Sequence, residues 1–379
     1  MSNPHVAFAN RTVFEAMQTG IILQDRELTE TLTGVSRQPD RNPAKASSRL
    51  LWMVLAALLV RLIVLAFLYP EQLDPRQDHF RFGFETGRIA RSIAQGQGFK
   101  DVASFREALK TNAKYIPTSA EQILDDFRRY IAQMQPKLPD LFGYIPGSPV
   151  TVEAIPPFQS AAATHYQTGT PDGTRPGRVS VATSNFAHRW LVDDEATAYH
   201  EGIPGHHMQL SVAQQMKDLP KFRQHSGNSG YVEGWALYSE QLGKEVGFYR
   251  DPVSDYGRLS SELFRAVRLV VDTGLHSEGW SRDQVVEFFR KYQPVDEPTI
   301  QSETDRYIAW PAQALSYKLG QLKFRELRDR AQKELGSKFD IRSFHDEMLN
   351  GGVLPLDLLD ARTNSWIQAQ KTAVKSAAN

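Results

Sequence analysis

The stretch from Tyr199 to Gln209 reads YHEGIPGHHMQ and places three imidazoles and one carboxylate within eight residues. Neutral imidazole nitrogens bind Zn²⁺ at about 2.0–2.1 Å, and a carboxylate beside such a site can take a proton from a metal-bound water. Glu201 directly follows His200 and is the candidate for this general base. The sequence therefore predicts a zinc site built around this stretch.

The spacing of these histidines differs from the usual H-E-x-x-H pattern. In a regular helix, residues four apart share a face, whereas a residue six positions on lies about 120° away. A straight helix therefore cannot bring His200 and His206 to one ion. His207 shares the face of His200 but lies about 10 Å farther along the axis. Pro204 and two flanking glycines favour a break that returns one of the later histidines to the site.

Two neighbouring segments support a site over its alternative, a solvated His-rich loop. Residues 192–199 combine an acidic first turn with good helix formers, which predicts that His200 lies on a helix. A second carboxylate-bearing segment, GYVEGWALYSE at residues 230–240, follows a turn rich in Gly, Ser and Asn. It supplies Glu233 as a third ligand.

Five motifs occur in the order HEGIPGHHMQ, EGWALYSE, RLVVDTGLHSEGWS, RYIAWPAQALSYKLG and GGVLPLDLLD. Together they resemble domain-of-unknown-function family 885, a branch of the gluzincin metallopeptidases. The resemblance covers residues 101 to 370, and the upstream run ATHYQTGTPDGTRPGRVSVAT (163–183) also looks like this family. Family members are longer, with a further helical N-terminal half. The resemblance implies a mostly α-helical catalytic domain with a small β-sheet over residues 101–373.

The resemblance also implies roles for individual residues. The Gly205-His206 pair is similar to the Gly-His that ends the H-E-x-G-H form of thimet-oligopeptidase-like relatives, which assigns His206 to the metal with His200 and Glu233. His207 would then face the substrate cleft or Glu240, although it stays open as the alternative ligand. Candidates for substrate binding or oxyanion stabilisation lie in the matching motifs: Arg268, His276, Gln313 and Tyr317.

Structural interpretations of these residues stay open beside the functional ones. Tyr317 occurs at helical spacing, where a tyrosine commonly serves packing. Arg268 could form an ordinary surface pair with Asp272, four residues on. Two histidines and one carboxylate also accept Mn²⁺, Co²⁺ or Fe²⁺ in place of Zn²⁺.

Composition limits the class of protein. The chain has 379 residues, of which 41% are hydrophobic and 23% charged, as expected for one large domain or two smaller ones. Its 44 Lys and Arg balance 44 Asp and Glu, so no excess positive charge favours a nucleic-acid partner. The absence of Cys excludes disulfides and thiolate ligands. Nothing in the composition predicts an oligomeric state.

The N-terminal part differs from the rest. Residues 1–49 are polar and carry no assignable pattern, whereas Leu50 to Tyr69 contains twenty residues with Arg61 as the only charge. This length predicts a transmembrane helix, with a buried core helix as the alternative. More basic residues precede the run than follow it, which places the N-terminus in the cytoplasm and the catalytic domain outside it, in a bacterial periplasm.

Residues 70–100 form a junction whose sequence resembles a different class of protein from the rest of the chain. The run DPRQDHFRFGFETGRIARSIAQGQGF, together with the preceding apolar run, resembles the start of polytopic lipid-linked-sugar glycosyltransferases, with Asp78 as the counterpart of an acidic catalytic residue. Such enzymes need many membrane spans, and the sequence has no second run of spanning length. We therefore interpret these residues as a fragment joined near Phe99.

Hydrophobic spacing predicts the remaining elements. A Ser119-capped helix follows Pro117, and short strands are expected at 150–155 and 178–183. The second strand is expected to offer its edge to an extended peptide. Five helices should follow residue 240, at 256–273, 281–292, 301–310, 314–335 and 341–349.

The function predicted from these features is zinc-dependent hydrolysis of peptide bonds, with Glu201 as base and Tyr317 or His276 beside the oxyanion. Its substrate would be a peptide, and the membrane would be contacted through residues 50–69. Two alternatives belong to other classes. One is a membrane-anchored, non-catalytic metal-binding or scaffold protein, and the other is a glycosyltransferase fragment.

Overall fold

The computed structural model describes residue 109 and residues 112–377, apart from 161, 185, 221–222, 224–226 and 294. Contacts divide the chain into a unit of residues 1–106 and a unit of residues 107–379, and all described residues belong to the second. The predictions for segments 1–49, 50–69 and 70–100 therefore lie outside the described residues. Within the described part, no helix combines the length and the apolar character needed to cross a membrane.

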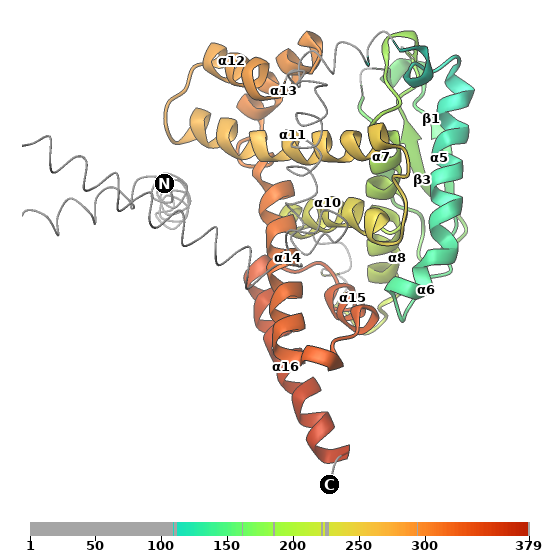
Figure 1. The fold of residues 1–379 in the computed structure, drawn as a ribbon, viewed down its shortest axis with the longest axis vertical. Coiled ribbons are helices and arrows are strands. Elements are labelled where there is room, and N and C mark those ends of the chain that lie inside the picture. The colour runs from blue at the N-terminus through green and yellow to red at the C-terminus, as the bar shows by residue number, and fades with distance from the viewer. Residues whose placement is uncertain are drawn as a thin grey trace, which may run out of the picture. The chain divides into compact units, whose positions relative to one another are not determined.

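The described unit is mostly helical with one small sheet, as predicted (Figure 1). The sheet contains β1 (Val150–Ala154), β2 (His165–Gln167) and β3 (Gly177–Val181) in the order β1-β3-β2. β3 runs parallel to β1 and antiparallel to β2. Both edges of β3 are thus occupied, and the prediction that this strand offers a free edge to a peptide is wrong.

The helices up to residue 245 are α5 (Ala120–Met134), α6 (Leu138–Leu141), α7 (Asp194–Glu201), α8 (His206–Gln215) and α10 (Ser229–Glu245). Those that follow are α11 (Pro252–His276), α12 (Arg282–Tyr292), α13 (Glu297–Ala309), α14 (Leu315–Leu335), α15 (Ile341–Leu349) and α16 (Leu356–Ala377). Short 3-10 turns lie at Ala113–Tyr115, Gln135–Lys137, Pro157–Gln159, Phe186–His188 and Gly336–Lys338.

Sequence signals account for several helix starts. Ser119 accepts a hydrogen bond from the Gln122 N–H at the start of α5, as predicted. Ser281 and Gln284 form a reciprocal capping box at the start of α12. Helix α11 begins four residues before the predicted position because Asp251 caps it and proline occupies its first turn. The start of α13 is displaced for the same reason, with Asp296 as its cap.

The central helix is α10, which contacts α7 and α8 on one side and α14 on another (Figure 1). Its approach to α14 depends on two glycines. A Cβ on Gly234 would lie 2.4 Å from the Gly320 Cα, and one on Gly320 would lie 1.8 Å from the Gly230 carbonyl oxygen. Only residues without a side chain permit this crossing. It fixes Glu233 on α10 and Tyr317 on α14 near each other.

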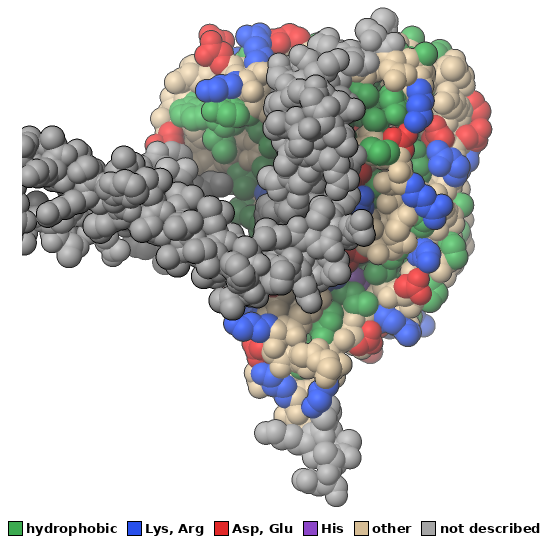
Figure 2. Space-filling model, in the orientation of Figure 1, with side chains coloured by type: hydrophobic (Ala, Val, Ile, Leu, Met, Phe, Trp, Pro, Cys, Tyr) green, Lys and Arg blue, Asp and Glu red, His purple; other side chains and the backbone are tan. Residues whose placement is uncertain are grey.

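The main hydrophobic core lies around α10 and joins α5, the sheet, α7, α14, α15 and α16, with Trp235 fully buried at its centre. A second core links α11, α12 and α13 through side chains such as Phe289 and Tyr307. Charged side chains of both signs and hydrophobic side chains share the surface of the described residues. Figure 2 shows basic and acidic side chains next to each other along the edge that carries α5, where Arg128 pairs with Glu121 at 2.6 Å.

Candidate metal centre

Two separate helices carry the histidines of the stretch from Tyr199 to Gln209. His200 lies in the last turn of α7, and α8 begins at His206 after the connector Gly202–Gly205. A Cβ on Gly205 would lie 2.0 Å from the His200 carbonyl oxygen, so the chain can fold back this tightly only with glycine there. The predicted break between the histidines is thus present, and it solves the spacing problem of a straight helix.

Helix α10 holds this connector in place. The Pro204 carbonyl oxygen accepts hydrogen bonds from the Trp235 Nε1–H at 2.9 Å and from the Ser239 hydroxyl at 3.3 Å. Trp235 is completely buried, so this contact is shielded from water. The same helix carries Glu233, and the break is therefore anchored to the element that supplies the third predicted ligand.

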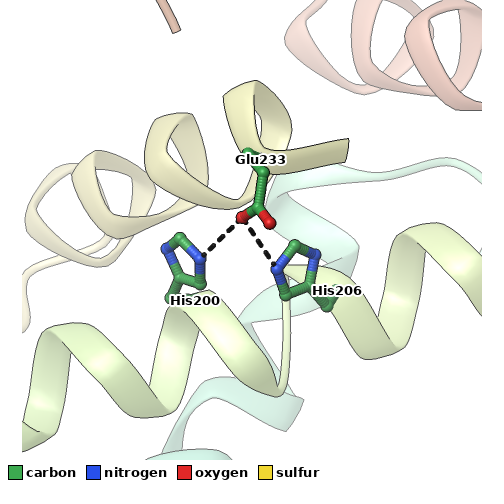
Figure 3. Close-up of side chains that lie close together, drawn as sticks. All are labelled: His200, His206 and Glu233. Atoms are coloured by element: carbon green, nitrogen blue, oxygen red, sulfur yellow. Dashed lines mark ion pairs between the residues drawn. The ribbon is translucent and has the colours of Figure 1, made fainter. Parts of the chain in front are cut away.

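Three side chains converge as predicted (Figure 3). The Glu233 Oε2 lies 3.5 Å from the His200 Nε2 and 3.4 Å from the His206 Nε2. The three candidate ligand atoms all lie within 4.8 Å of one another. Ligands about 2.0–2.1 Å from a tetrahedral zinc ion are separated by roughly 3.3 Å, and the two distances from the Glu233 Oε2 are close to this value.

A second carboxylate orients the first histidine. The Glu240 Oε1 lies 2.8 Å from the His200 Nδ1, and the other Glu240 oxygen accepts from the Ser261 hydroxyl at 3.2 Å. Carboxylates in this position fix the ring and leave the opposite nitrogen free to bind metal. Glu240 lies seven residues after Glu233, two helical turns along the same face of α10. That spacing could have revealed its role from the sequence.

Charge at the centre favours a cation. Burial opposes the charged form of His200, but hydrogen bonds with Glu233 and Glu240 outweigh it and raise the pKa of His200 to about 9. Burial also opposes the Glu233 carboxylate, yet its hydrogen bonds to the two imidazoles hold the pKa of Glu233 well below the ordinary value. The metal-free site thus keeps a proton near neutral pH, in the place that a metal ion would take.

Glu201 follows His200 at the end of α7 and is 9% exposed. Its negative charge contributes to the raised pKa of His200. The carboxylate group is not part of the three-atom cluster. Glu201 is therefore a buried carboxylate that acts electrostatically on the first candidate ligand.

His207 contacts the sheet region and not Glu240. Its Nε2 lies 3.0 Å from the Ser148 carbonyl oxygen, and its Nδ1 lies 3.0 Å from the Tyr166 hydroxyl. A carbonyl only accepts, so Nε2 carries the hydrogen and Tyr166 donates to Nδ1. The expectation that His207 faces Glu240 is wrong, because α8 turns this ring toward the sheet while Glu240 binds His200. The ring joins α8 to β2 and to the chain entering β1.

Tyr317 lies beside the centre on α14. Its ring stacks on that of His200 with centroids 6.4 Å apart. Burial, reinforced by the negative charge of Glu233, raises the pKa of Tyr317, so the phenol keeps its proton at neutral pH. The Gln313 side-chain amide donates to the phenol oxygen at 3.3 Å, and the Arg268 guanidinium lies 4.8 Å from the ring centroid. Three predicted residues thus gather here.

The pairing of Arg268 with Asp272 is not observed. Arg268 instead pairs with Glu303 at 2.8 Å, whereas both Asp272 carboxylate oxygens accept from the Ala312 N–H at 3.0 and 3.2 Å. Helix α13 and the turn before α14 pack against α11 and provide these closer partners. A long-range contact therefore replaces the expected local pair.

His276 lies apart from this group. Its Nε2 is 2.9 Å from the Tyr307 carbonyl oxygen, so it donates to the backbone of α13. It follows Arg268 by eight residues on α11, a separation of about 12 Å along the axis. The geometry therefore favours Tyr317 over His276 for a role at the oxyanion.

Solved structures share this fold. A predicted lipoprotein from Colwellia psychrerythraea is 36% identical, with a TM-score of 0.70 over 79% of this chain and 53% of that one. A predicted lipoprotein of unknown function from Shewanella oneidensis has a TM-score of 0.62 at 17% identity, over 74% of this chain and 53% of that one. The chain thus spans about half the length of each.

No curated protein matches the chain. A family model matches residues 84–362, which is more than half of the sequence. The match begins within the junction segment 70–100, upstream of the boundary expected near Phe99. The protein therefore belongs to the family described as bacterial proteins of unknown function (DUF885).

Proposed function

We propose that the protein hydrolyses peptide bonds with the help of one zinc ion held by His200, His206 and Glu233. The observation that carries this proposal is the convergence of three ligand atoms, with Glu201 directly after the first of these ligands in the sequence. Two imidazoles and one carboxylate form the ligand set of several zinc hydrolases, which keep a fourth position open for water or substrate. The set also accepts Mn²⁺, Co²⁺ or Fe²⁺.

The residues present fit such an ion. Glu240 fixes the His200 ring, and the Glu233 Oε2 lies 3.4 and 3.5 Å from the two imidazole nitrogens, close to the separation of two ligands on one zinc ion. Zinc bound there would lower the pKa of a coordinated water from about 15.7 toward 7 and polarise a substrate carbonyl.

The chain's own groups would move the protons and hold the substrate. Glu201 accepts a proton at its carboxylate as the peptide carbonyl is attacked, and then delivers it to the departing amine. Tyr317 keeps its phenol proton at neutral pH and donates a hydrogen bond to the carbonyl oxygen as negative charge develops there. General acid–base catalysis of this kind contributes about 10²–10⁴-fold to the rate.

The location proposed for this reaction is outside the cytoplasm, at a membrane. The Colwellia relative is described as a predicted lipoprotein, and residues 50–69 have the length and composition of a spanning helix. Peptides in the periplasm would be the substrates. A non-catalytic metal-binding role is the second candidate, because the cluster of His200, His206 and Glu233 would by itself also serve to bind a metal.

The test is a peptide-library digest by the purified full chain, with and without a chelator. We expect cleavage that the chelator abolishes and added zinc restores. Glu201→Gln should keep the metal but lose about 10²–10⁴-fold in rate, because an amide of the same shape cannot accept the proton. Full metal content without cleavage in the unaltered chain would favour the non-catalytic role. Loss of metal in Glu201→Gln would make this residue a ligand instead of a base.

A further inference from the structure

The segment between α13 and α14 adopts an unusual conformation next to Tyr317. Ala312 has a φ of 67°, in the left-handed region that residues with a side chain seldom adopt. Both Asp272 carboxylate oxygens accept from the Ala312 N–H and hold the turn in this shape. Such conformations persist where the surrounding structure enforces them, and they are frequent at functional sites. The residue that immediately follows this turn is Gln313.

The contacts of Gln313 determine which way its amide points. The Arg306 Nη1 donates to the Gln313 Oε1 at 2.6 Å. A guanidinium is only a donor, so the group facing it must be the amide oxygen. The amide nitrogen then faces the Tyr317 oxygen at 3.3 Å. Arg306 is itself fixed by Glu303 at 3.0 Å, so its guanidinium is held by partners on two sides.

This arrangement has a consequence for the phenol. The Tyr317 oxygen accepts from Gln313, and its single hydrogen must therefore point elsewhere. The Arg268 guanidinium lies 4.8 Å from the centre of the Tyr317 ring, and the centre of the His200 ring lies 6.4 Å from it. The phenol hydrogen is thus left free for an acceptor other than Gln313.

We propose that Arg306 and Gln313 are positioning residues that orient the phenol hydrogen of Tyr317 toward the oxygen of a substrate carbonyl. This inference rests on the proposed function and extends it to residues that do not touch the reacting atoms. Asp272 supports the same arrangement through the turn at Ala312. The motifs around residues 268–272 and 306–317 then serve one purpose, which is to present Tyr317 as a donor.

Gln313→Glu tests the proposal because it keeps the shape and reverses the polarity. A carboxylate held by Arg306 would accept the hydrogen of Tyr317 and withdraw it from the substrate. We expect kcat to fall about 10²–10³-fold, as for the loss of an oxyanion donor, with KM nearly unchanged. In a Tyr317→Phe background the same change should have no further effect. Gln368→Glu, at an exposed position on α16, is the matched control for the added charge.

The unaltered protein, Gln313→Glu, Tyr317→Phe and the double variant are also compared by calorimetric binding of a phosphinic pseudotripeptide of alanine, whose tetrahedral phosphinyl group mimics the reaction intermediate. We expect weaker binding in Gln313→Glu only where Tyr317 is present. An equal loss with Phe at position 317 would mean simple charge repulsion, and unchanged affinity or no binding at all would also overturn the inference. Should the unaltered protein bind the compound but cleave no peptide, the proposed function fails while this binding comparison still decides the role of Gln313.

Discussion

At the residue scale, His206 and His207 are adjacent but face different surroundings. His206 directs its Nε2 to Glu233, whereas His207 bonds to Ser148 and Tyr166. We expect His206→Ala to lose nearly all bound zinc. His207→Ala should keep the zinc but lower the free energy of unfolding by about 1–3 kcal/mol, because it leaves the partly buried Tyr166 hydroxyl and Ser148 carbonyl without this partner. Metal analysis and urea denaturation of both variants provide the measurement. Loss of zinc in His207→Ala, with zinc retained in His206→Ala, would make His207 the ligand.

The pKa of His200 gives a second prediction at this scale. The metal-free site holds a proton on His200 up to a pH of about 9, and zinc must displace it. Zinc affinity should therefore increase about tenfold per pH unit as pH rises toward 9, and level off above it. Titration against a competing chelator from about pH 6 to 9 measures this slope.

Glu240→Gln is the control for this slope. It removes one of the hydrogen bonds that raise the pKa of His200, so the plateau should begin at lower pH. Loss of the Glu240 carboxylate, which orients the His200 ring, should also weaken zinc binding about 10–100-fold. An affinity independent of pH in the unaltered protein would contradict a protonated His200 in the metal-free site.

The chemistry of single residues could be predicted from the sequence, but their partners could not. The types and spacing of His200, Glu201 and Glu233 are enough to indicate a metal site. The partner of His200 is Glu240, which lies forty residues later in the sequence. The packing of α7 against α10 brings the two side chains together. Local spacing also allowed a pair of Arg268 with Asp272, whereas tertiary packing supplies Glu303.

At the element scale, the crossing of α10 and α14 determines where Glu233 and Tyr317 lie. Gly234→Ala would place a Cβ 2.4 Å from the Gly320 Cα and push the helices apart. We expect a loss of about 1–3 kcal/mol in the free energy of unfolding, together with weaker zinc binding. Gly147→Ala is the matched control because nothing lies within 4 Å of its Cβ position. A Gly234→Ala protein as stable as the control would show that the crossing tolerates a side chain.

Helices were easier to predict than strands in this chain. Amphipathic spacing and caps such as Ser119 and Ser281 mark α5 and α12. Strand β2 has three residues, His165–Gln167, without alternation of apolar and polar side chains. It is held by pairing with β3 and by the Tyr166 contact to His207, neither of which a local pattern reveals. The central position of β3 was missed for the same reason.

At the scale of the whole molecule, the chain brings separate helices to one centre. Helix α7 supplies His200 and Glu201, α8 supplies His206, and α10 supplies Glu233. Helix α14 adds Tyr317, which α11 and α13 hold through Arg268 and its partners. The order of these motifs in the sequence indicates the family, and their convergence in space supports the proposed hydrolase.

The most direct test of the metal centre is zinc analysis of the purified full chain combined with X-ray absorption at the zinc edge. We predict one zinc ion per chain, with two imidazole nitrogens at about 2.0–2.1 Å, the remaining ligands oxygen, and no sulfur. Absence of stoichiometric zinc uptake, or a spectrum without two imidazoles, would contradict the account of His200, His206 and Glu233 as its ligands.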